Sequence, residues 1–245
     1  MVERKERLEE EFELSAEDEA IHEYAALTDG YLHVTASLIA DEVANLAKAG
    51  TGVAVDLGSG PGSLVRELAL RFPQVLVIGL DISLPMTKLA QQRTASENAV
   101  FVVADVHHLP FRTQSIQMII SHGAMHHWRE LERALREVKE VLADKGFVYL
   151  SDLKRDAPDE LVAEIAALLN ENQAKAFVNS IKAAYTVAEL SALAAAAGLD
   201  NLHVEPEAFS RRTIARSIEK LRESPVRGIR QSALNLRMVG WAKTL

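Results

Sequence analysis

Hydrophobic and polar positions follow two alternating patterns from residue 52 onward. Short, nearly continuous runs of Val, Ile and Leu are followed by stretches in which apolar residues recur at helical spacing. Such runs are typical of parallel strands buried on both faces, and the stretches between them of amphipathic crossover helices. The expected strands are GVAVDL, VLVIGLD, AVFVVAD, IQMIISH, GFVYLSDL, DNLHVEPEAF and ALNLRMVGWAKTL. This pattern predicts a doubly wound α/β fold with a seven-stranded, mostly parallel, Rossmann-like sheet.

Helical patterns flank this core on both sides. Residues 16–49 predict helices broken by a turn at residues 28–30, and we expect these helices to cap the edge of the sheet. After Asp152 the segments DELVAEIAALLNENQ, AKAFVNSIKAA and TVAELSALAAAAGL predict three more helices. In the last of them, Thr186 and Glu189 match a capping box, and Gly198 is expected to end the helix.

The organisation along the chain favours a single domain over residues 1–245. We expect a tail and cap helices over residues 1–49, a ligand-binding core over 50–153, and C-terminal helices and final strands over 154–245. No internal repeat or low-complexity linker divides these parts.

Composition excludes several kinds of chemistry. The 245 residues are 48% apolar and 25% charged, an ordinary globular composition. The absence of cysteine removes disulfides, thiolate metal sites and cysteine nucleophiles. No apolar run is long enough to cross a bilayer, and the N-terminus lacks the apolar core of a signal peptide. We therefore expect a cytoplasmic protein without a membrane span.

The net charge of −8 is unevenly distributed. Residues 1–20 hold nine acidic and three basic side chains, a balance of −6, so the rest of the chain carries −2. Residues 210–243 hold nine Lys or Arg and two Glu, a balance of +7. A charge run is usually a solvated face. The alternatives are an anionic substrate, a contact with the acidic tail, and nucleic acid.

A glycine-rich stretch follows the first strand. That strand ends at Asp56, residues 58–62 hold three glycines, and a helix is expected to begin near residues 61–63. Ligands bind beyond the carboxyl ends of such strands, where glycines let the main chain approach. A dinucleotide fingerprint places its third glycine where Ser63 stands, and Asp56 would repel a pyrophosphate. A positively charged ligand fits better.

At this point the chain resembles the class I S-adenosylmethionine-dependent methyltransferases. Their first motif, an acidic residue and G-x-G-x-G, is matched by Asp56, Gly58, Gly60 and Gly62. VIGLDIS, VVADVHHLPF and IISHGAMHHW follow in the family's order, and the resemblance covers about residues 45–153. The most similar group contains quinone-biosynthesis C-methyltransferases and their small-molecule relatives.

The resemblance implies S-adenosylmethionine as cofactor and assigns residues to it. In the family, Asp81 accepts hydrogen bonds from both ribose hydroxyls, with Ile82 beside the adenine. Asp105 binds the adenine amino group, with the backbone of Val106 nearby. The full set of expected cofactor-binding residues is Asp56, Gly58, Ser59, Gly60, Gly62, Asp81, Ile82, Asp105, Val106, Ser121 and His122, the last two through main-chain groups that face the methionine part.

Five histidines stand at the expected strand ends: His107, His108, His122, His126 and His127. Adjacent residues on a helix point about 100° apart, so neither adjacent pair easily aims both rings at one metal ion, and we expect no metal site. A histidine titrates near neutrality and can take the proton of a methyl acceptor. His126 is the first candidate for this catalytic role and His127 the second.

The expected reaction is in-line methyl transfer to a small molecule, whose pocket we expect to be lined by Tyr24, Tyr31, His33 and the segment 177–185. SHGA replaces the N/D-P-P-Y/F motif of DNA amino-methyltransferases, which argues against that class. The absence of cysteine argues against the families that methylate cytosine C5 or arsenite. Modification of tRNA or another nucleic acid and a non-catalytic, cofactor-binding partner subunit remain alternatives. A nicotinamide-dependent oxidoreductase is disfavoured by Ser63. The acceptor, the methylated atom and the oligomeric state stay open.

Overall fold

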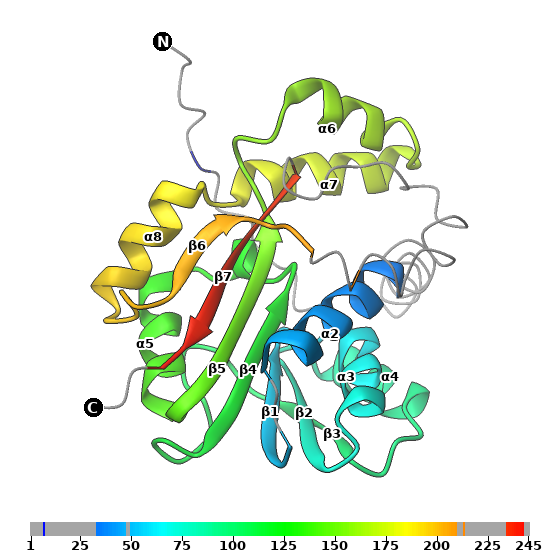
Figure 1. Cartoon of the computed structure of the whole chain (residues 1–245). Coiled ribbons are helices and arrows are strands. Elements are labelled where there is room, and N and C mark those ends of the chain that lie inside the picture. The colour runs from blue at the N-terminus through cyan, green and yellow to red at the C-terminus, as the bar shows by residue number, and fades with distance from the viewer. Residues whose placement is uncertain (1–6, 8–32, 48–49, 210–212, 214–233, 243–245) are drawn as a thin grey trace.

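The computed structural model describes residues 7, 33–47, 50–209, 213 and 234–242, and it contains one seven-stranded sheet with helices on both faces (Figure 1). The elements in chain order are α2 (His33–Ala47), β1 (Gly52–Leu57), α3 (Ser63–Arg71), β2 (Val75–Asp81), α4 (Leu84–Arg93), β3 (Ala99–Val103), β4 (Ile116–His122), the short 3-10 helix η2 (Met125–His127), α5 (Leu131–Val141), β5 (Leu142–Leu153), α6 (Asp159–Ala166), α7 (Glu171–Ala183), α8 (Val187–Ala196), β6 (His203–Pro206) and β7 (Asn235–Trp241).

The strands are ordered β3-β2-β1-β4-β5-β7-β6 across the sheet. The first five in this order pair in parallel, whereas β7 lies antiparallel between β5 and β6. The chain moves outward from β1 to β3 and then returns to place β4 on the other side of β1. Such a reversal opens a crevice at the carboxyl ends of the two central strands, where ligands of this fold class bind. The predicted fold class and the mostly parallel seven-stranded sheet are confirmed.

Both faces of the sheet are buried at its centre, which explains the continuous apolar runs there. Ile119 and Ile120 are adjacent in β4 and both are 0% exposed, yet they belong to opposite cores. Ile119 packs in the core that includes α5 and α8, and Ile120 in the core that includes α2 and α3. A strand whose side chains are buried on both sides loses the alternation of apolar and polar residues seen in half-exposed strands.

The helices before and after the core differ from the prediction in two respects. In the described part of the N-terminal region, α2 packs on a face of the sheet, where Ile39 and Val43 join the core of Tyr149, and does not cap an edge. The chain after residue 158 also divides differently. The segment predicted as one helix to Gln173 ends at Ala166, and α7 begins after Asn170.

Local hydrogen bonds explain these helix boundaries. Asn170 Oδ1 accepts a hydrogen bond of 2.9 Å from the amide of Gln173, whose side chain accepts one from the Asn170 amide, and this capping box starts α7. The predicted capping box of Thr186 and Glu189 is confirmed at the start of α8. Gly198 follows that helix with a left-handed φ of 76°, as expected for a helix end.

Candidate cofactor and active site

The loop between β1 and α3 is fixed to the end of β2 by backbone hydrogen bonds. The amides of Gly58 and Ser59 both donate to the carbonyl oxygen of Leu80, at 2.8 and 3.0 Å. Gly58, Gly60 and Gly62 all adopt left-handed φ angles, of 74°, 49° and 81°. Glycine takes this conformation without steric cost, so the three-glycine motif is what lets the chain turn here.

Two of these glycines are required by the protein's own packing. A Cβ on Gly58 would lie 2.5 Å from the Cβ of Ala124, and one on Gly62 would lie 2.8 Å from the ring of Phe101. From the sequence, the glycines are expected to permit the close approach of a ligand. At Gly58 and Gly62 that interpretation is incomplete, because side chains from the β4 end and from β3 already occupy the space.

Two buried carboxyl groups, Asp56 and Asp81, stand at the ends of β1 and β2. Asp81 accepts hydrogen bonds from the amides of Gly60 and Ser83, both at 2.8 Å. No hydrogen bond reaches the Asp56 carboxyl group within the described residues, and its residue is 2% exposed. Burial, and second the charge of Asp81, raise the pKa of Asp56 to about 8. Burial also raises the pKa of Asp81, opposed by the hydrogen bonds from Ser83 and Gly60. A ligand that brings positive charge would stabilise both carboxylates.

Ser59 adds an unsatisfied polar atom to the same loop. Its hydroxyl is buried and has no hydrogen-bond partner in the part of the chain that the structure describes. Buried polar groups are rarely left without a partner in native proteins. The backbone of the loop is therefore held in place within the protein, whereas the Ser59 hydroxyl still lacks a hydrogen-bond partner among the described residues.

The other residues expected near the adenosine end differ in their availability. Ile82, next to Asp81, is 45% exposed and offers apolar surface, whereas Val106 is buried in the core. Asp105 lies just beyond β3 and accepts hydrogen bonds at Oδ1 from the amide of His107, at 2.9 Å, and from its ring Nδ1, at 2.6 Å. Burial acts to raise the pKa of Asp105, but these hydrogen bonds and the charges of His107 and His108 outweigh it and lower that pKa.

The end of β4 is tied to its neighbours on both sides. The hydroxyl of Ser121 donates a 2.7 Å hydrogen bond to the carbonyl oxygen of Leu57, at the end of β1. His122 Nδ1 lies 3.1 Å from the hydroxyl of Ser151 on β5. Burial lowers the pKa of His122. The sequence-predicted residues of β1, β2 and β4 thus lie together at the carboxyl ends of these strands.

His126 is held by a carboxylate that sequence reasoning missed. Asp152, near the end of β5, accepts the His126 amide at Oδ2 and contacts the His126 ring Nδ1 at Oδ1, both at 2.8 Å. Both residues are buried. These hydrogen bonds and the charge of His126 lower the pKa of Asp152 in spite of its burial. Nδ1 is directed at the carboxylate, so Nε2 is the ring nitrogen that does not contact Asp152. The one sequence signal for Asp152 was its place at the end of a predicted strand.

His127 lies directly against the ring of His126. The ring centroids are 3.9 Å apart and the rings are tilted by 44°. Burial, and second the charge of His126, lower the pKa of His127 to about 3. An imidazole with this pKa is neutral and weakly basic at neutral pH, which supports ranking His126 before His127 as the candidate base.

Arg7 connects the N-terminal region to the same place. Its guanidinium donates to the carbonyl oxygens of Ala183, at 2.8 Å, and His126, at 3.3 Å, and lies 4.3 Å from the centre of the Tyr185 ring. The end of the segment 177–185, expected to line the acceptor pocket, is thereby placed beside His126. α6 and α7 lie beyond the arrowheads of β4 and β5 in Figure 1.

Some expected residues cannot be placed. Tyr24 and Tyr31 lie outside the described residues, and His33 begins α2 without a described side chain. Among the residues that the structure describes, no group of three or more His, Asp or Glu side chains is arranged to hold a metal ion. Within the same residues, no helix has the length and apolar character needed to span a membrane.

Residues 55–150 match the family model described as "Methyltransferase domain". This segment is a methyltransferase domain. The resemblance to the class I S-adenosylmethionine-dependent methyltransferases is confirmed, and the matched segment contains the second half of β1, all elements from α3 to α5, and most of β5.

Curated relatives match part of the chain. A demethylmenaquinone methyltransferase of Roseiflexus castenholzii is 33% identical over 113 residues, which are 46% of this chain and 48% of that protein. A malonyl-[acyl-carrier protein] O-methyltransferase of Legionella pneumophila is 30% identical over 44% of this chain and 38% of its own length. The matches to these two relatives therefore span less than half of each relative's length.

Solved structures share the fold over a larger part of the chain. The plantazolicin methyltransferase BpumL, solved in complex with SAH (S-adenosylhomocysteine), superimposes with a TM-score of 0.75 over 94% of this chain and 92% of its own, at 14% identity. At this identity the likeness concerns the fold, and it extends that likeness to the elements outside residues 55–150.

Proposed function

We propose that this protein is an S-adenosylmethionine-dependent methyltransferase that transfers the methyl group to a small-molecule acceptor. The observation that carries the proposal is the pair of buried carboxyl groups, Asp56 and Asp81, beside a three-glycine loop at the point where the strand order reverses. This arrangement favours a cationic nucleoside over a pyrophosphate, because a carboxylate repels phosphate in a partly desolvated site. The match of residues 55–150 to the methyltransferase domain supports it.

The residues present fit the cofactor. A carboxylate has about four acceptor positions, so Asp81 keeps capacity for the two ribose hydroxyls after accepting from Gly60 and Ser83. Ile82 would cover one side of the adenine, and the main chain of Ser121 and His122 would face the methionine part. The hydroxyl of Ser59 would gain the hydrogen-bond partner that it lacks within the described residues. Asp105 and Val106 remain predicted contacts of the adenine.

When bound, the cofactor supplies an activated methyl group on a sulfonium centre that leaves as a neutral thioether. The chain's main task is then to align the acceptor with that methyl group and to exclude water, an effect worth several kcal/mol. Where the acceptor atom carries a proton, His126 would accept it at Nε2, and Asp152 would stabilise the resulting imidazolium. His127, neutral beside it, would serve mainly to position the ring.

The acceptor is proposed to be a small molecule of the kind used by C- and O-methylating enzymes, with the pocket between the N-terminal region and the segment 177–185. Tyr24, Tyr31 and His33 remain predicted lining residues.

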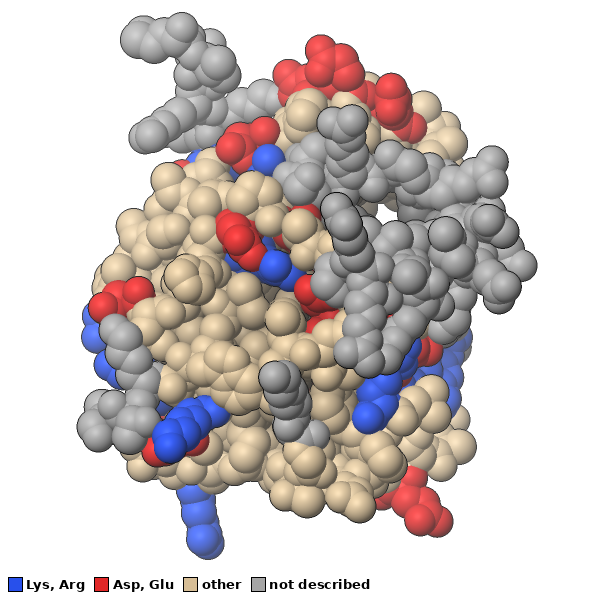
Figure 2. All heavy atoms as spheres, viewed as in Figure 1, with Lys and Arg blue, Asp and Glu red and all other residues tan. Residues whose placement is uncertain are grey.

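The nucleic-acid alternative has less support. Of the nine basic residues between 210 and 243, only Arg237 is described, and it is bound to Glu205 and Glu42 and therefore not available to phosphate. On the face shown in Figure 2, the Lys and Arg side chains of the described residues are scattered. No observation favours the alternative of a non-catalytic partner subunit.

A thermal-shift panel tests the proposed function. Wild type is heated alone and with S-adenosylmethionine, S-adenosylhomocysteine, NAD or NADP, each about a hundredfold above its dissociation constant. Either adenosyl compound should raise Tm by roughly 5 °C or more, and the nicotinamide cofactors should not. Asp81→Ala should abolish the shift. Asp144→Ala, at an exposed carboxylate near the opposite end of the sheet, should keep it. A shift with NAD or NADP alone would overturn the proposal.

A further inference from the structure

A row of polar residues crosses the sheet beside the proposed methyl-transfer site. The strand register aligns His122 of β4 with Ser151 of β5, Ser151 with Arg237 of β7, and Arg237 with Glu205 of β6. Asn235 pairs with Leu153, two residues nearer the carboxyl end of β5. These polar groups therefore lie at the edge of the sheet where the glycine loop and His126 also lie.

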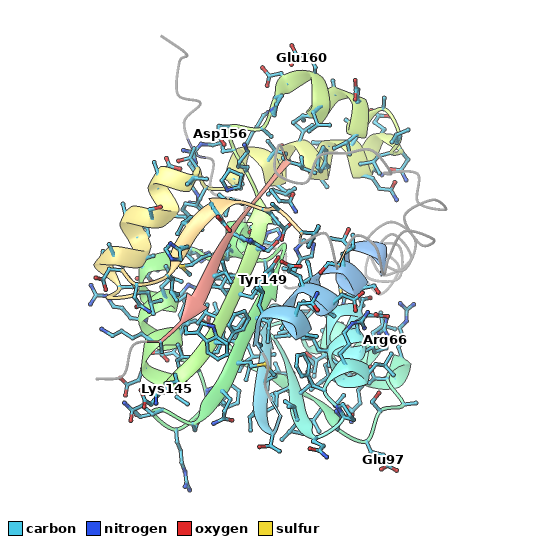
Figure 3. All side chains as sticks on the ribbon, viewed as in Figure 1. Arg66, Glu97, Lys145, Tyr149, Asp156 and Glu160 are labelled. Carbon is cyan, nitrogen blue, oxygen red and sulfur yellow. The ribbon has the colours of Figure 1, made fainter. Side chains whose placement is uncertain are left out.

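Glu207 is the most deeply buried acid of this group. It is 0% exposed, and its carboxyl oxygens accept hydrogen bonds from the hydroxyl of Tyr149, at 3.0 Å, and from Nδ2 of Asn235, at 3.1 Å. Tyr149 lies near the middle of the sheet in Figure 3. Both donors are neutral, and within the described residues no ion pair reaches Glu207. A buried carboxylate ordinarily has a cationic partner.

The guanidinium nearby is already engaged. Arg237 donates to Glu205 at 2.9 and 2.7 Å and to Glu42 at 3.5 Å. Its planar fork therefore holds two other carboxylates, and among the described residues the side-chain partners of Glu207 are Tyr149 and Asn235.

Asn235, next to Glu207, also has a polar atom without a partner among the described residues. The residue is 4% exposed, and its Nδ2 is committed to Glu207. Its Oδ1 is buried and accepts no hydrogen bond within the described part of the chain. When Glu207 is ionised, reversing the amide does not correct this, because its oxygen would then face a carboxylate oxygen. A carboxylate without a cation and an amide oxygen without a donor thus lie side by side.

The position of this pair suits a ligand that also reaches the methyl-transfer site. The charge of Glu207 acts on the His122 imidazole and partly offsets the lowering of its pKa by burial. Neighbouring strands are about 4.8 Å apart, so β7 lies roughly 10 Å from β4, which is the length of a small molecule.

We propose that Glu207 and Asn235 form a subsite for a positively charged, hydrogen-bond-donating group of the methyl acceptor, an ammonium group above all. The ammonium places its charge on Glu207 and donates a hydrogen bond to Asn235 Oδ1. The acceptor is therefore an amine-bearing small molecule, whose methylated atom and charged group are separated by roughly 10 Å, the distance between β4 and β7. This inference rests on the proposed function, since it treats the crevice as the site of a methyl acceptor.

Three ligands of equal chain length test the subsite. Butylamine, butan-1-ol and butyrate differ only in a cationic, a neutral and an anionic end group. Each is titrated into the full chain saturated with S-adenosylhomocysteine, and binding is followed by ligand-observed NMR. Butylamine should bind at least tenfold more tightly than butan-1-ol, and butyrate should not bind.

Variants assign that preference to the two residues. Glu207→Gln should reduce the preference for butylamine over butan-1-ol to less than twofold. Asn235→Leu should weaken the binding of both butylamine and butan-1-ol. Glu160→Gln, on the outer side of α6 in Figure 3, is the control and should behave as wild type. Melting curves show whether each variant folds; if Glu207→Gln does not, Asn235→Leu decides the question.

The outcomes separate this inference from the proposed function. Equal binding of the three ligands, or no binding of butylamine to the wild type, overturns the subsite and means that Glu207 and Asn235 are satisfied by water. A preference for butylamine that survives in Glu207→Gln, or unchanged binding of both ligands to Asn235→Leu, also overturns it. Failure of the wild type to bind S-adenosylhomocysteine contradicts the proposed function itself.

Discussion

The amide of Gly60 donates a 2.8 Å hydrogen bond to Oδ2 of Asp81, which joins the loop after β1 to the carboxylate that ends β2. The two residues are 21 positions apart in the chain. Because this bond forms within the protein, the orientation of the Asp81 carboxylate does not depend on a ligand. A site arranged in advance loses less conformational entropy on binding.

Alanine substitutions at glycines should separate backbone strain from steric overlap. Gly58→Ala combines a left-handed φ with a clash against Ala124, so the free energy of unfolding should fall by about 3 kcal/mol. Gly123→Ala has a left-handed φ and open space, and should cost about 1 kcal/mol. Gly50→Ala has neither and is the control. Urea unfolding measures all three, and equal losses at Gly58 and Gly123 would show that the contact with Ala124 is unimportant.

The stability of the free protein should fall as pH rises toward 8. Since the pKa of Asp56 is about 8 in the folded protein and 3.8 ordinarily, the folded state holds a proton that the unfolded state releases between these values. This part of the stability is complete below pH 3.8 and is lost through pH 8, by at most about 1.4 kcal/mol per pH unit.

Asp56→Asn tests this pH dependence. Urea unfolding between pH 6.5 and 8.5 should show that the free energy of unfolding of the variant increases relative to that of wild type as pH rises. The window avoids lower pH, where the lowered pKa values of His122 and His127 act in the opposite direction. Parallel curves for the two proteins would exclude a protonated Asp56.

Removing the Asp152 carboxyl should destabilise the end of β5 and change the pH profile of catalysis. Asp152→Ala leaves the His126 amide and ring without their acceptor in a buried place, a loss of about 3 kcal/mol. Asp152→Asn keeps the volume. With an accepted substrate, it should lower kcat more than it raises KM and shift the acidic limb of the kcat profile. An unchanged profile would leave Asp152 with a structural role alone.

The Ser121 hydroxyl should matter for stability and not for cofactor binding. Ser121→Ala removes the 2.7 Å hydrogen bond to Leu57 and should cost about 1 kcal/mol, because the bond is buried. The affinity for S-adenosylhomocysteine should stay within about twofold, since the expected contact is through the main chain. Ser191→Ala removes a bond of the same length at an exposed position and should be neutral. A large loss of affinity in Ser121→Ala would give the hydroxyl itself a role.

The strands and the glycine loop could be predicted from the sequence because local patterns encode them. Ile119 and Ile120 show that burial on both faces produces an apolar run, and the three glycines mark a backbone that only glycine adopts easily. The start of α7 was missed because Asn170 lies among residues that favour helix, and its capping bonds become evident only in three dimensions.

The partners of His126 and Glu207 could not be predicted in the same way. Asp152 lies 26 residues from His126, and Glu207 lies 58 residues from Tyr149. Both contacts depend on which strands are neighbours. Periodicity indicates that β6 and β7 are strands, but it does not show that β7 lies between β5 and β6 and runs antiparallel to them.

A crystal structure of the full chain grown with saturating S-adenosylhomocysteine tests most directly whether the loop and the two carboxylates hold the nucleoside. The ribose hydroxyls should lie within hydrogen-bond distance of the Asp81 carboxylate, with the amino-acid part along residues 58–62. An empty crevice at these concentrations, or a ligand bound elsewhere on the protein, would contradict the assignment.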